Sequence, residues 1–302
     1  MDKMLSPEGN IFDRRQSRLA SAHPGPRESN ALCYADRILP CLAVVLASYA
    51  LADAARAEPD AVELAKKLAN PVSSLISLPL QLNFDDRIGA LDEGSRVSFN
   101  IQPVIPISLN DDWNLISRTI LPLVRQENVV PGSGSQSGIG DTVQSLFFSP
   151  ADPSAGGWVW GAGPALLLPT ATDQLLGARK WGAGPTAVAL RQQGPWTYGF
   201  LLNHIWSFAG DSKRDEVNST FVQPFVGYTT PAAWSFDLQT ETTYDWENQQ
   251  WNVPLVFLVS KVTSVGSQLI QVQAGPRYYA RHLVGGPEGL SFRIAVTLLF
   301  PR

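Results

Sequence analysis

Cysteine is nearly absent from this chain of 302 residues. Its two cysteines, Cys33 and Cys41, lie within the first 57 residues, and the rest of the chain also has no methionine. A disulfide framework and a cysteine-based metal site are therefore excluded for residues 58–302. Because that region holds only two histidines, His204 and His282, we expect no metal site and no cofactor.

Charged residues are also scarce, at 17% of the sequence, below the usual quarter. The net charge of −4 is small and no basic cluster stands out, so we do not expect nucleic acid as a partner. What is abundant is 24 glycines, 23 prolines and 10% aromatic residues, which disfavour long helices and favour strands separated by turns. A single large β-barrel reaches this length.

The apolar run at 38–51 has the features of a signal peptide. An arginine precedes it, Ala55-Arg56-Ala57 offers a cleavage site, and Ala50-Leu51-Ala52 offers a competing one. The run is too short for a comfortable membrane-spanning helix, and the alternative is a buried core helix. No small residues precede Cys41, so we expect no lipid anchor. We predict that residues 1–57 are a signal peptide and presequence, with a start site assigned too early.

Residues 60–70 form the one good helix candidate. Asp60 can cap its N-terminus, Glu63 follows at capping-box spacing, and Asn70-Pro71 ends it. This helix is either periplasmic or a short plug, and the sequence leaves both open. We therefore divide the mature chain into an N-terminal helix or plug at 58–74 and an outer-membrane β-barrel at 75–302.

The barrel prediction depends on the segments that follow the helix. No later run reaches the ~18 apolar residues of a membrane helix, so any crossing must use strands. Nearly all of twelve segments have the ~10 residues of a tilted spanning strand, and short turns alternate with longer polar links, as in outer-membrane barrels. We predict a single antiparallel transmembrane β-barrel of about twelve strands. The segments are about 75–84, 96–109, 113–125, 138–149, 158–169, 181–192, 196–208, 219–230, 234–245, 251–262, 267–281 and 290–300.

The last segment shows the two-residue period of a strand clearly. One of its faces is wholly apolar: Phe292, Ile294, Val296, Leu298 and Phe300. Arg293 lies on the opposite, mixed face, and a charged side chain cannot face lipid cheaply. We expect the apolar face to meet lipid, Arg293 to face the interior, and this strand to close the barrel against 75–84.

Tryptophans are expected in two belts at the ends of the strands. Trp113, Trp158, Trp196 and Trp234 each follow a short turn, and Trp181, Trp206, Trp246 and Trp251 lie near the longer links. Amphipathic rings gather in this way at lipid–water interfaces. The alternative is the core of a soluble β-protein, which would concentrate tryptophan in the middle of the strands.

Five charged residues fall on the inferred inner face and are the candidate lumen or selectivity residues: Arg118, Asp237, Glu241, Arg277 and Arg293. Glu241, Arg277 and Arg293 are expected to form an ion-pair network. Such a network either selects solutes by charge at a constriction or holds a packed polar interior shut.

Two patterns that resemble catalytic or nucleotide sites are not supported. Asn203, His204 and Ser207 match the residue trio of an outer-membrane phospholipase family with twelve strands, but His204 and Ser207 fall on opposite faces of one strand. The glycine-rich segment 132–140 lacks the Lys-Ser/Thr ending of a phosphate loop and precedes a strand. We therefore expect no catalytic residues and no enzyme activity.

Several long segments resemble a family of Gram-negative outer-membrane β-barrels that are named only as transporters, some mistakenly as neuromedin U. This family is akin to the barrels linked to phenol-degradation operons. The resemblance covers roughly 61–302 and implies an outer-membrane barrel that exports or takes up small molecules. The resemblance does not assign any functional-site residue in this sequence. The segments are NPVSSLISLPLQ (70–81), NIQPVIPISLNDDWNLISRTILPL (100–123), GDTVQSLFFSP (140–150), GPALLLPTATD (163–173), KWGAGPTAVAL (180–190), GPWTYGFLLNHIWSFAGD (194–211) and TYDWENQQWNVPL (243–255).

We thus expect a channel or transporter in the outer membrane of a Gram-negative bacterium, with outer-membrane lipid and a small-molecule solute as its partners. The resemblance suggests apolar or aromatic solutes. One alternative is a structural or adhesive barrel with a filled lumen that acts through its outer loops. A membrane-lipid hydrolase is a third. The oligomeric state stays open.

Overall fold

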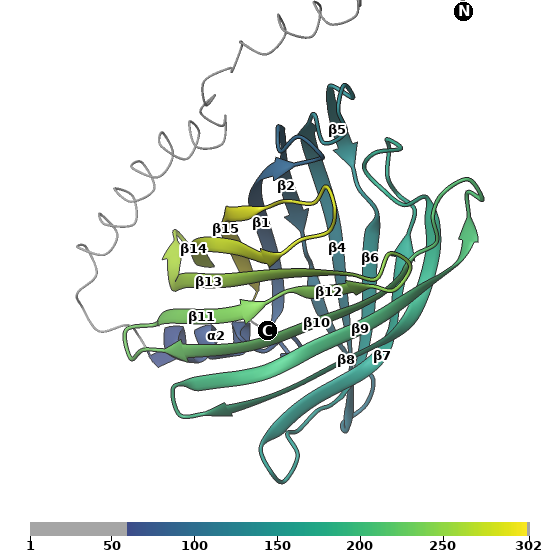
Figure 1. The fold of residues 1–302 in the computed structure, drawn as a ribbon. Helices are drawn as coiled ribbons and strands as arrows, with labels where there is room; N and C mark the ends of the chain where they lie inside the picture. Colours follow the sequence, from purple (N-terminus) through teal and green to yellow (C-terminus); the bar gives the residue numbers. More distant parts are fainter. Residues whose placement is uncertain (1–58, 301–302) are drawn as a thin grey trace, which may run out of the picture.

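The computed structural model describes residues 59–300, and the predicted signal peptide lies outside them. These residues form one short helix and a closed twelve-stranded antiparallel β-barrel, which confirms the predicted fold class (Figure 1). The elements in chain order are α2 (Pro59–Leu68), β1 (Ile76–Ile88), β2 (Gly94–Ile101), β3 (Val104–Ser108), β4 (Trp113–Glu127), β5 (Ser135–Ile139), β6 (Thr142–Pro150), β7 (Trp158–Leu168), β8 (Lys180–Gln193), β9 (Trp196–Gly210), β10 (Asn218–Thr229), β11 (Trp234–Thr240), β12 (Thr242–Asp245), β13 (Gln250–Val265), β14 (Gln268–Arg281) and β15 (Gly289–Phe300).

Fifteen strand segments make twelve strands within residues 59–300, because three strands are interrupted. β2 continues as β3, β5 as β6, and β11 as β12, and the two halves share neighbouring strands. Pro103 lies in the first interruption, where a residue without an N–H cannot complete the hydrogen-bond ladder. Glu241 lies in the third.

The barrel closes between its first and last strands. β1 pairs antiparallel with β15 from Ile76 opposite Phe300 to Phe84 opposite Phe292. This pairing agrees with the closure that alternation in the last strand predicts. The other strands pair with their sequence neighbours around the wall, so the closed sheet has no free edge.

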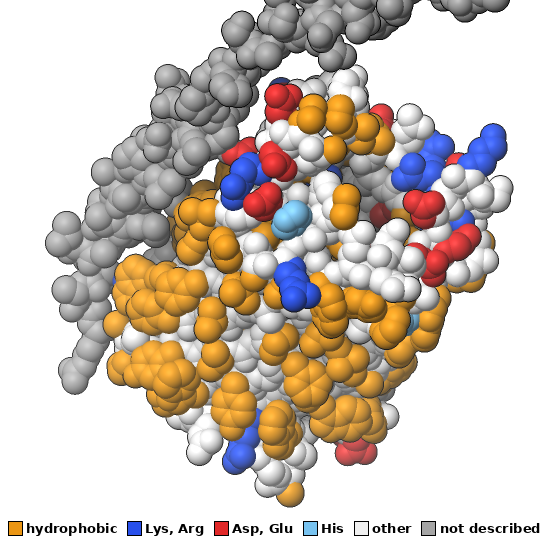
Figure 2. Space-filling view, viewed as in Figure 1, with side chains coloured by type: hydrophobic (Ala, Val, Ile, Leu, Met, Phe, Trp, Pro, Cys, Tyr) orange, Lys and Arg blue, Asp and Glu red, His pale blue; other side chains and the backbone are white. Residues whose placement is uncertain are grey.

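Side chains alternate between a lipid-facing outer wall and the lumen along the strands. On β11, for example, Phe236 and Leu238 are exposed on the outer wall, whereas Ser235 between Trp234 and Phe236 is buried in the interior. Figure 2 shows hydrophobic side chains spread over the wall, while most charged side chains gather at its upper end. An apolar band between polar ends matches a lipid bilayer.

The connections differ in length at the two ends of the barrel. The end with the shorter connections has links 109–112, 151–157, 194–195, 230–233 and 266–267, and the other end has 89–93, 128–134, 169–179, 211–217, 246–249 and 282–288. The alternation matches the sequence-based expectation except at 246–249, which is short, and at 151–157, which is as long as several links of the other end. The link at 89–93 is also shorter than the expected 85–95, because Asp85 to Ile88 continue β1.

α2 lies at the end with the short turns and packs against the inner wall (Figure 1). Ala65 is 1% exposed and packs with Leu75, Val262 and Leu299, whose side chains point inward. The helix ends before Asn70, whose side chain accepts a hydrogen bond from the Val72 amide at 3.0 Å. Within 59–300, no helix is long and apolar enough to cross a membrane. The helix therefore packs on inward-facing residues of the barrel wall at this end.

Candidate functional site

A cavity of about 840 Å³ occupies the lumen on the side of the long loops. Inward-facing residues of strands on every side line it, and residues 283–287 of the loop between β14 and β15 complete the lining. The lining is rich in amide and hydroxyl side chains. Its charged side chains are four arginines and two acids: Arg96, Arg118, Arg277, Arg293, Asp85 and Glu241.

Glu241 and Arg293 form the centre of a polar network on one wall of this cavity. Arg293 donates hydrogen bonds from Nη1 and Nη2 to the two carboxylate oxygens of Glu241, at 2.6 and 2.8 Å. Its Nε donates a third to Asn83 Oδ1 at 2.7 Å. Since Arg293 is only 3% exposed, these bonds replace the water that a buried guanidinium loses.

Arg277 joins the same network and binds a second acid. Its Nη1 donates to Asp85 Oδ1 at 2.9 Å, and its Nη2 lies 3.9 Å from Glu241 Oε2. The Tyr279 hydroxyl also donates to Asp85, at 3.1 Å. Glu241, Arg277 and Arg293 therefore come together, and β1 supplies the second acid of the network.

Arg118 faces the same cavity without joining an ion pair. Its Nη2 donates to Gln102 Oε1 at 3.2 Å. Arg96 also binds an amide in place of a carboxylate, since its Nε donates to Gln126 Oε1 at 3.0 Å. Among residues 59–300, neither guanidinium has a carboxylate within ion-pair distance. Both side chains are half-buried, whereas Arg277 and Arg293 are buried.

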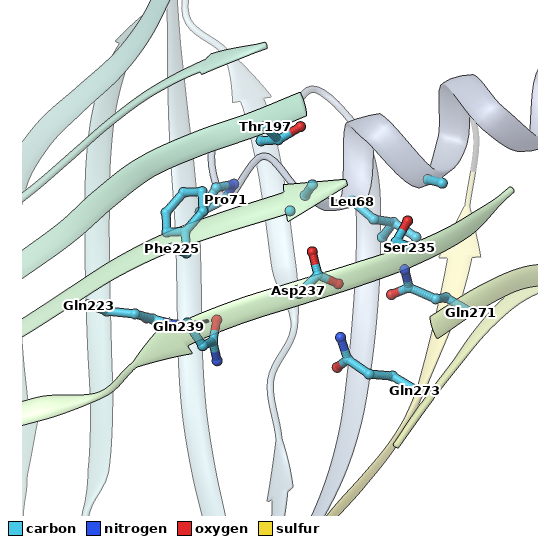
Figure 3. Close-up of a pocket in the computed structure, with 13 residues that line it drawn as sticks. Leu68, Pro71, Thr197, Gln223, Phe225, Ser235, Asp237, Gln239, Gln271 and Gln273 are labelled. Atoms are coloured by element: carbon cyan, nitrogen blue, oxygen red, sulfur yellow. Dashed lines mark hydrogen bonds between the residues drawn. The ribbon is translucent and has the colours of Figure 1, made fainter. Parts of the chain in front are cut away.

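Asp237 lies apart from the other charged residues, in a smaller pocket of about 160 Å³ beside α2 (Figure 3). Leu68 and Pro71 line this pocket from the N-terminal segment, and Gln271 and Gln273 line it from β14. The Asp237 carboxylate lies opposite Gly227 on β10, where the Cβ of any other residue would overlap its Oδ1 atom.

A row of glutamines lies where the large cavity and the pocket beside α2 meet. Gln223, Gln239 and Gln273 line both the large cavity and the pocket beside α2. Gln223 donates to Gln239 at 3.1 Å, and Gln239 donates to Glu241 at 3.1 Å. This row connects the charged wall of the cavity with the pocket at the α2 end of the lumen.

The opposite wall of the lumen is apolar near its α2 end. Phe147, Val188, Leu190 and Leu201 pack there with Ile116 and with Val72 from the segment after α2. Phe147 and Leu190 have no exposed surface. The N-terminal segment thus fills this end by apolar contact.

Eight of the nine tryptophans are exposed: Trp113, Trp158, Trp160, Trp181, Trp196, Trp206, Trp246 and Trp251. The ninth, Trp234, is partly buried under Lys261, whose Nζ lies 5.3 Å from its ring. Several tryptophans contact other aromatic residues at the strand ends. Trp196 packs on Tyr228 at a centroid distance of 4.9 Å, and Trp246 packs on Tyr244 at 4.7 Å.

Sequence reasoning missed Asp85, Arg96 and Tyr279 as lumen residues. Asp85 stands in an Asp-Asp-Arg run that reads as a loop, and Arg96 opens a strand. The parity of Tyr279 with Arg277 is a signal that could have found the tyrosine.

The three residues of the phospholipase-like pattern are not assembled with one another. His204 Nδ1 bonds Thr220 Oγ1 at 2.7 Å on the outer wall. Ser207 Oγ faces the other side and donates to Glu216 Oε2 at 2.6 Å. Asn203 lines the large cavity.

No family model matches the chain, and no curated protein matches it. The fold is similar to solved outer-membrane barrels. An outer membrane channel from Pseudomonas putida F1 has a TM-score of 0.60 at 15% identity, with 75% of this chain and 96% of that chain covered. The NanC porin has a TM-score of 0.43 at 10% identity, with coverage of 74% and 98%. The fold is therefore that of the outer-membrane β-barrels.

Outer membrane phospholipase A from Escherichia coli is also among the similar structures, with a TM-score of 0.41 at 11% identity and coverage of 74% and 96%. This finding corrects our expectation that the chain is not an enzyme. Because a fold does not determine function, the barrel does not by itself exclude catalysis.

Proposed function

We propose that this protein is an outer-membrane channel through which small solutes cross. The observation that carries the proposal is the polar cavity of about 840 Å³, which shares its glutamine row with the smaller pocket beside α2. A barrel of twelve strands that served only as a scaffold would have its lumen filled by side chains. Here the outer half of the lumen is open space lined by groups that can replace the water around a solute.

The path runs from the long-loop end, past the charged residues and the glutamine row, to the pocket at α2. α2 and Val72 cover the far end through apolar contacts, so the channel is gated at the periplasmic side. The position of α2 and the short turns beside it support a periplasmic placement of this end. The signal-peptide pattern supports export to the outer membrane of a Gram-negative bacterium.

Small apolar or aromatic molecules are the solute class that the family resemblance implies. The apolar part of the cavity lining supports this class, since Ile120, Leu167 and Phe221 face the open space. Outer-membrane lipid surrounds the barrel as its second partner.

Liposome swelling tests the proposal. The purified chain is refolded into vesicles, and folding is checked by the difference in gel mobility between boiled and unboiled samples. We expect faster swelling with small solutes than in vesicles without protein. Folded protein that admits no solute of any class would contradict the channel.

A second function, a structural or adhesive barrel that acts through its outer loops, is favoured by the filled α2 end of the lumen. Deleting 129–133, in the loop between β4 and β5, tests this second function. The adhesive barrel predicts lost binding to a surface partner, and binding that survives the deletion would contradict it.

A further inference from the structure

We propose that Arg118 forms an anion site in the large cavity, with Arg96 as a second positive group nearer the long loops, and that the solutes of this channel are small organic carboxylates with an apolar body. The inference rests on the proposed channel function and specifies the chemical class of its solute. Four features of the cavity carry it: excess charge, free donors, occupied acids and an adjacent apolar strip.

The charge of the cavity is unbalanced. Four arginines and two acids line it, so two positive charges are left over. The two acids are neutralised by the two buried arginines. Arg277 and Arg293 bind them and are only 8% and 3% exposed. The excess therefore resides on Arg96 and Arg118, the two arginines of the cavity that are less buried than Arg277 and Arg293.

The donors of these two guanidinium groups are mostly unused. An arginine carries five N–H donors in a planar fork. In the described part of the chain, Arg96 uses its Nε on Gln126, and Arg118 uses one Nη2 hydrogen on Gln102. Each amide orients its arginine and leaves N–H groups directed to the cavity. A planar fork with free N–H groups binds a carboxylate through two parallel hydrogen bonds.

The acids that could neutralise these arginines are already occupied. Asp85 lies directly opposite Arg96 on the neighbouring strand, yet its Oδ1 accepts hydrogen bonds from Arg277 and Tyr279. Glu241 receives both arms of Arg293. The cavity's own carboxylates thus bind Arg277 and Arg293, which leaves the Arg96 and Arg118 guanidinium groups for an incoming anion.

An apolar strip lies beside Arg118 and fits the remainder of such a solute. Ile120 follows Arg118 on the inner face of β4 and pairs with Val143 on β6, which in turn pairs with Leu167 on β7. Ile205 on β9 lines the same cavity. A carboxylate on Arg118 can therefore place an apolar ring or chain on this strip, where burial removes apolar surface from water.

Benzoate and benzamide test the class directly, because they share shape and differ in charge. We expect benzoate to enter protein-containing vesicles about tenfold faster than benzamide, which corresponds to about 1.4 kcal/mol. In planar bilayers under a salt gradient, the reversal potential should show that chloride crosses more readily than potassium. Equal flux of the two probes together with no anion preference would overturn the inference.

Arg96→Gln combined with Arg118→Gln keeps hydrogen-bonding side chains and removes both charges. This double variant should bring benzoate flux down to that of benzamide and abolish the anion preference, with conductance retained. Asn100→Asp, which leaves both arginines in place and adds an acid to the same wall, should act in the same direction. Arg125→Gln is the matched control, because Arg125 lies on the outer face of β4 and its side chain is 70% exposed.

The outcomes separate this inference from the channel itself. A conducting barrel without anion preference, or one whose preference survives both lumen variants, contradicts the anion site and leaves the channel standing. A folded barrel that conducts nothing contradicts both. Loss of preference in Arg125→Gln would also overturn the assignment, since that charge lies outside the lumen.

Discussion

Arg293 binds Glu241 through two hydrogen bonds, at 2.6 and 2.8 Å, although 52 residues separate them in the chain. Arg293 belongs to β15, Glu241 interrupts β11 and β12, and the strands β13 and β14 lie between them. The pair therefore ties together strands that do not touch through their backbones. It also neutralises Arg293, and the excess positive charge of the cavity is left on Arg96 and Arg118.

Glu241→Gln should destabilise the barrel, because it leaves Arg293 buried without a carboxylate. Removal of one partner from a buried ion pair costs about 3–5 kcal/mol. Urea unfolding in lipid vesicles, followed by tryptophan fluorescence, measures the loss. The combined change of Glu241→Leu and Arg293→Met should cost less than Glu241→Gln, and a larger cost for the pair would contradict this account.

Ala65→Asp should open the α2 end of the lumen. Ala65 is 1% exposed among apolar residues, and a carboxylate there would lose its water without gaining a partner. The helix should leave the mouth, and single-channel conductance should rise. Glu63→Gln, at a side chain that is 66% exposed on the same helix, is the control and should leave conductance unchanged. Equal conductance in both variants would count against gating by α2.

Leu238→Lys tests which face of β11 meets lipid. Leu238 is 52% exposed on the outer wall, and a lysine on the lipid face costs about 2–4 kcal/mol near the bilayer midplane. Gln239→Lys, one residue further on, points into the lumen and keeps a donor near Glu241. Unfolding in vesicles should show a clear loss for the first variant and a smaller one for the second. Similar losses would refute the assignment of faces.

The loop 211–217 should loosen in acid. Hydrogen bonds from Lys180 Nζ and Ser207 Oγ to Glu216 lower the pKa of Glu216 from its ordinary value of 4.5. A carboxylate with a lowered pKa stabilises the fold above its unfolded-state value and loses that contribution as pH falls through the folded value. The protection of the Val217 amide from hydrogen exchange, relative to an unfolded peptide at the same pH, should therefore fall below about pH 4.5. Glu216→Gln should remove this pH dependence, and a pH dependence that persists would contradict it.

The sequence predicts the strands well because their signals are local. Alternation along the last strand places Phe292 outside and Arg293 inside, and the structure agrees on both. Short turns and tryptophans mark the strand ends for the same reason, since each depends on a few neighbouring residues.

The sequence predicts that Glu241, Arg277 and Arg293 meet, but the other contacts across the lumen could not be predicted, because they depend on the height of each residue in the closed barrel. Asp237 and Glu241 share a face and are four residues apart, a rise of roughly 13 Å along a strand. That rise puts Asp237 in the pocket beside α2, while Glu241 reaches Arg293. Asp85 was assigned to a loop because a run of charged residues hides the end of β1, and only closure against β15 brings it near Arg277.

The most direct test of the channel is the single-channel current of Asn100→Cys before and after a bulky charged thiol reagent. Residues 58–302 contain no native cysteine, Asn100 lines the cavity, and its neighbour Phe99 lies on the outer wall. We predict that the reagent reduces the current of Asn100→Cys and leaves that of Phe99→Cys unchanged. A folded barrel that carries no current, or a current that labelling at Asn100→Cys does not alter, would contradict a solute path through this lumen.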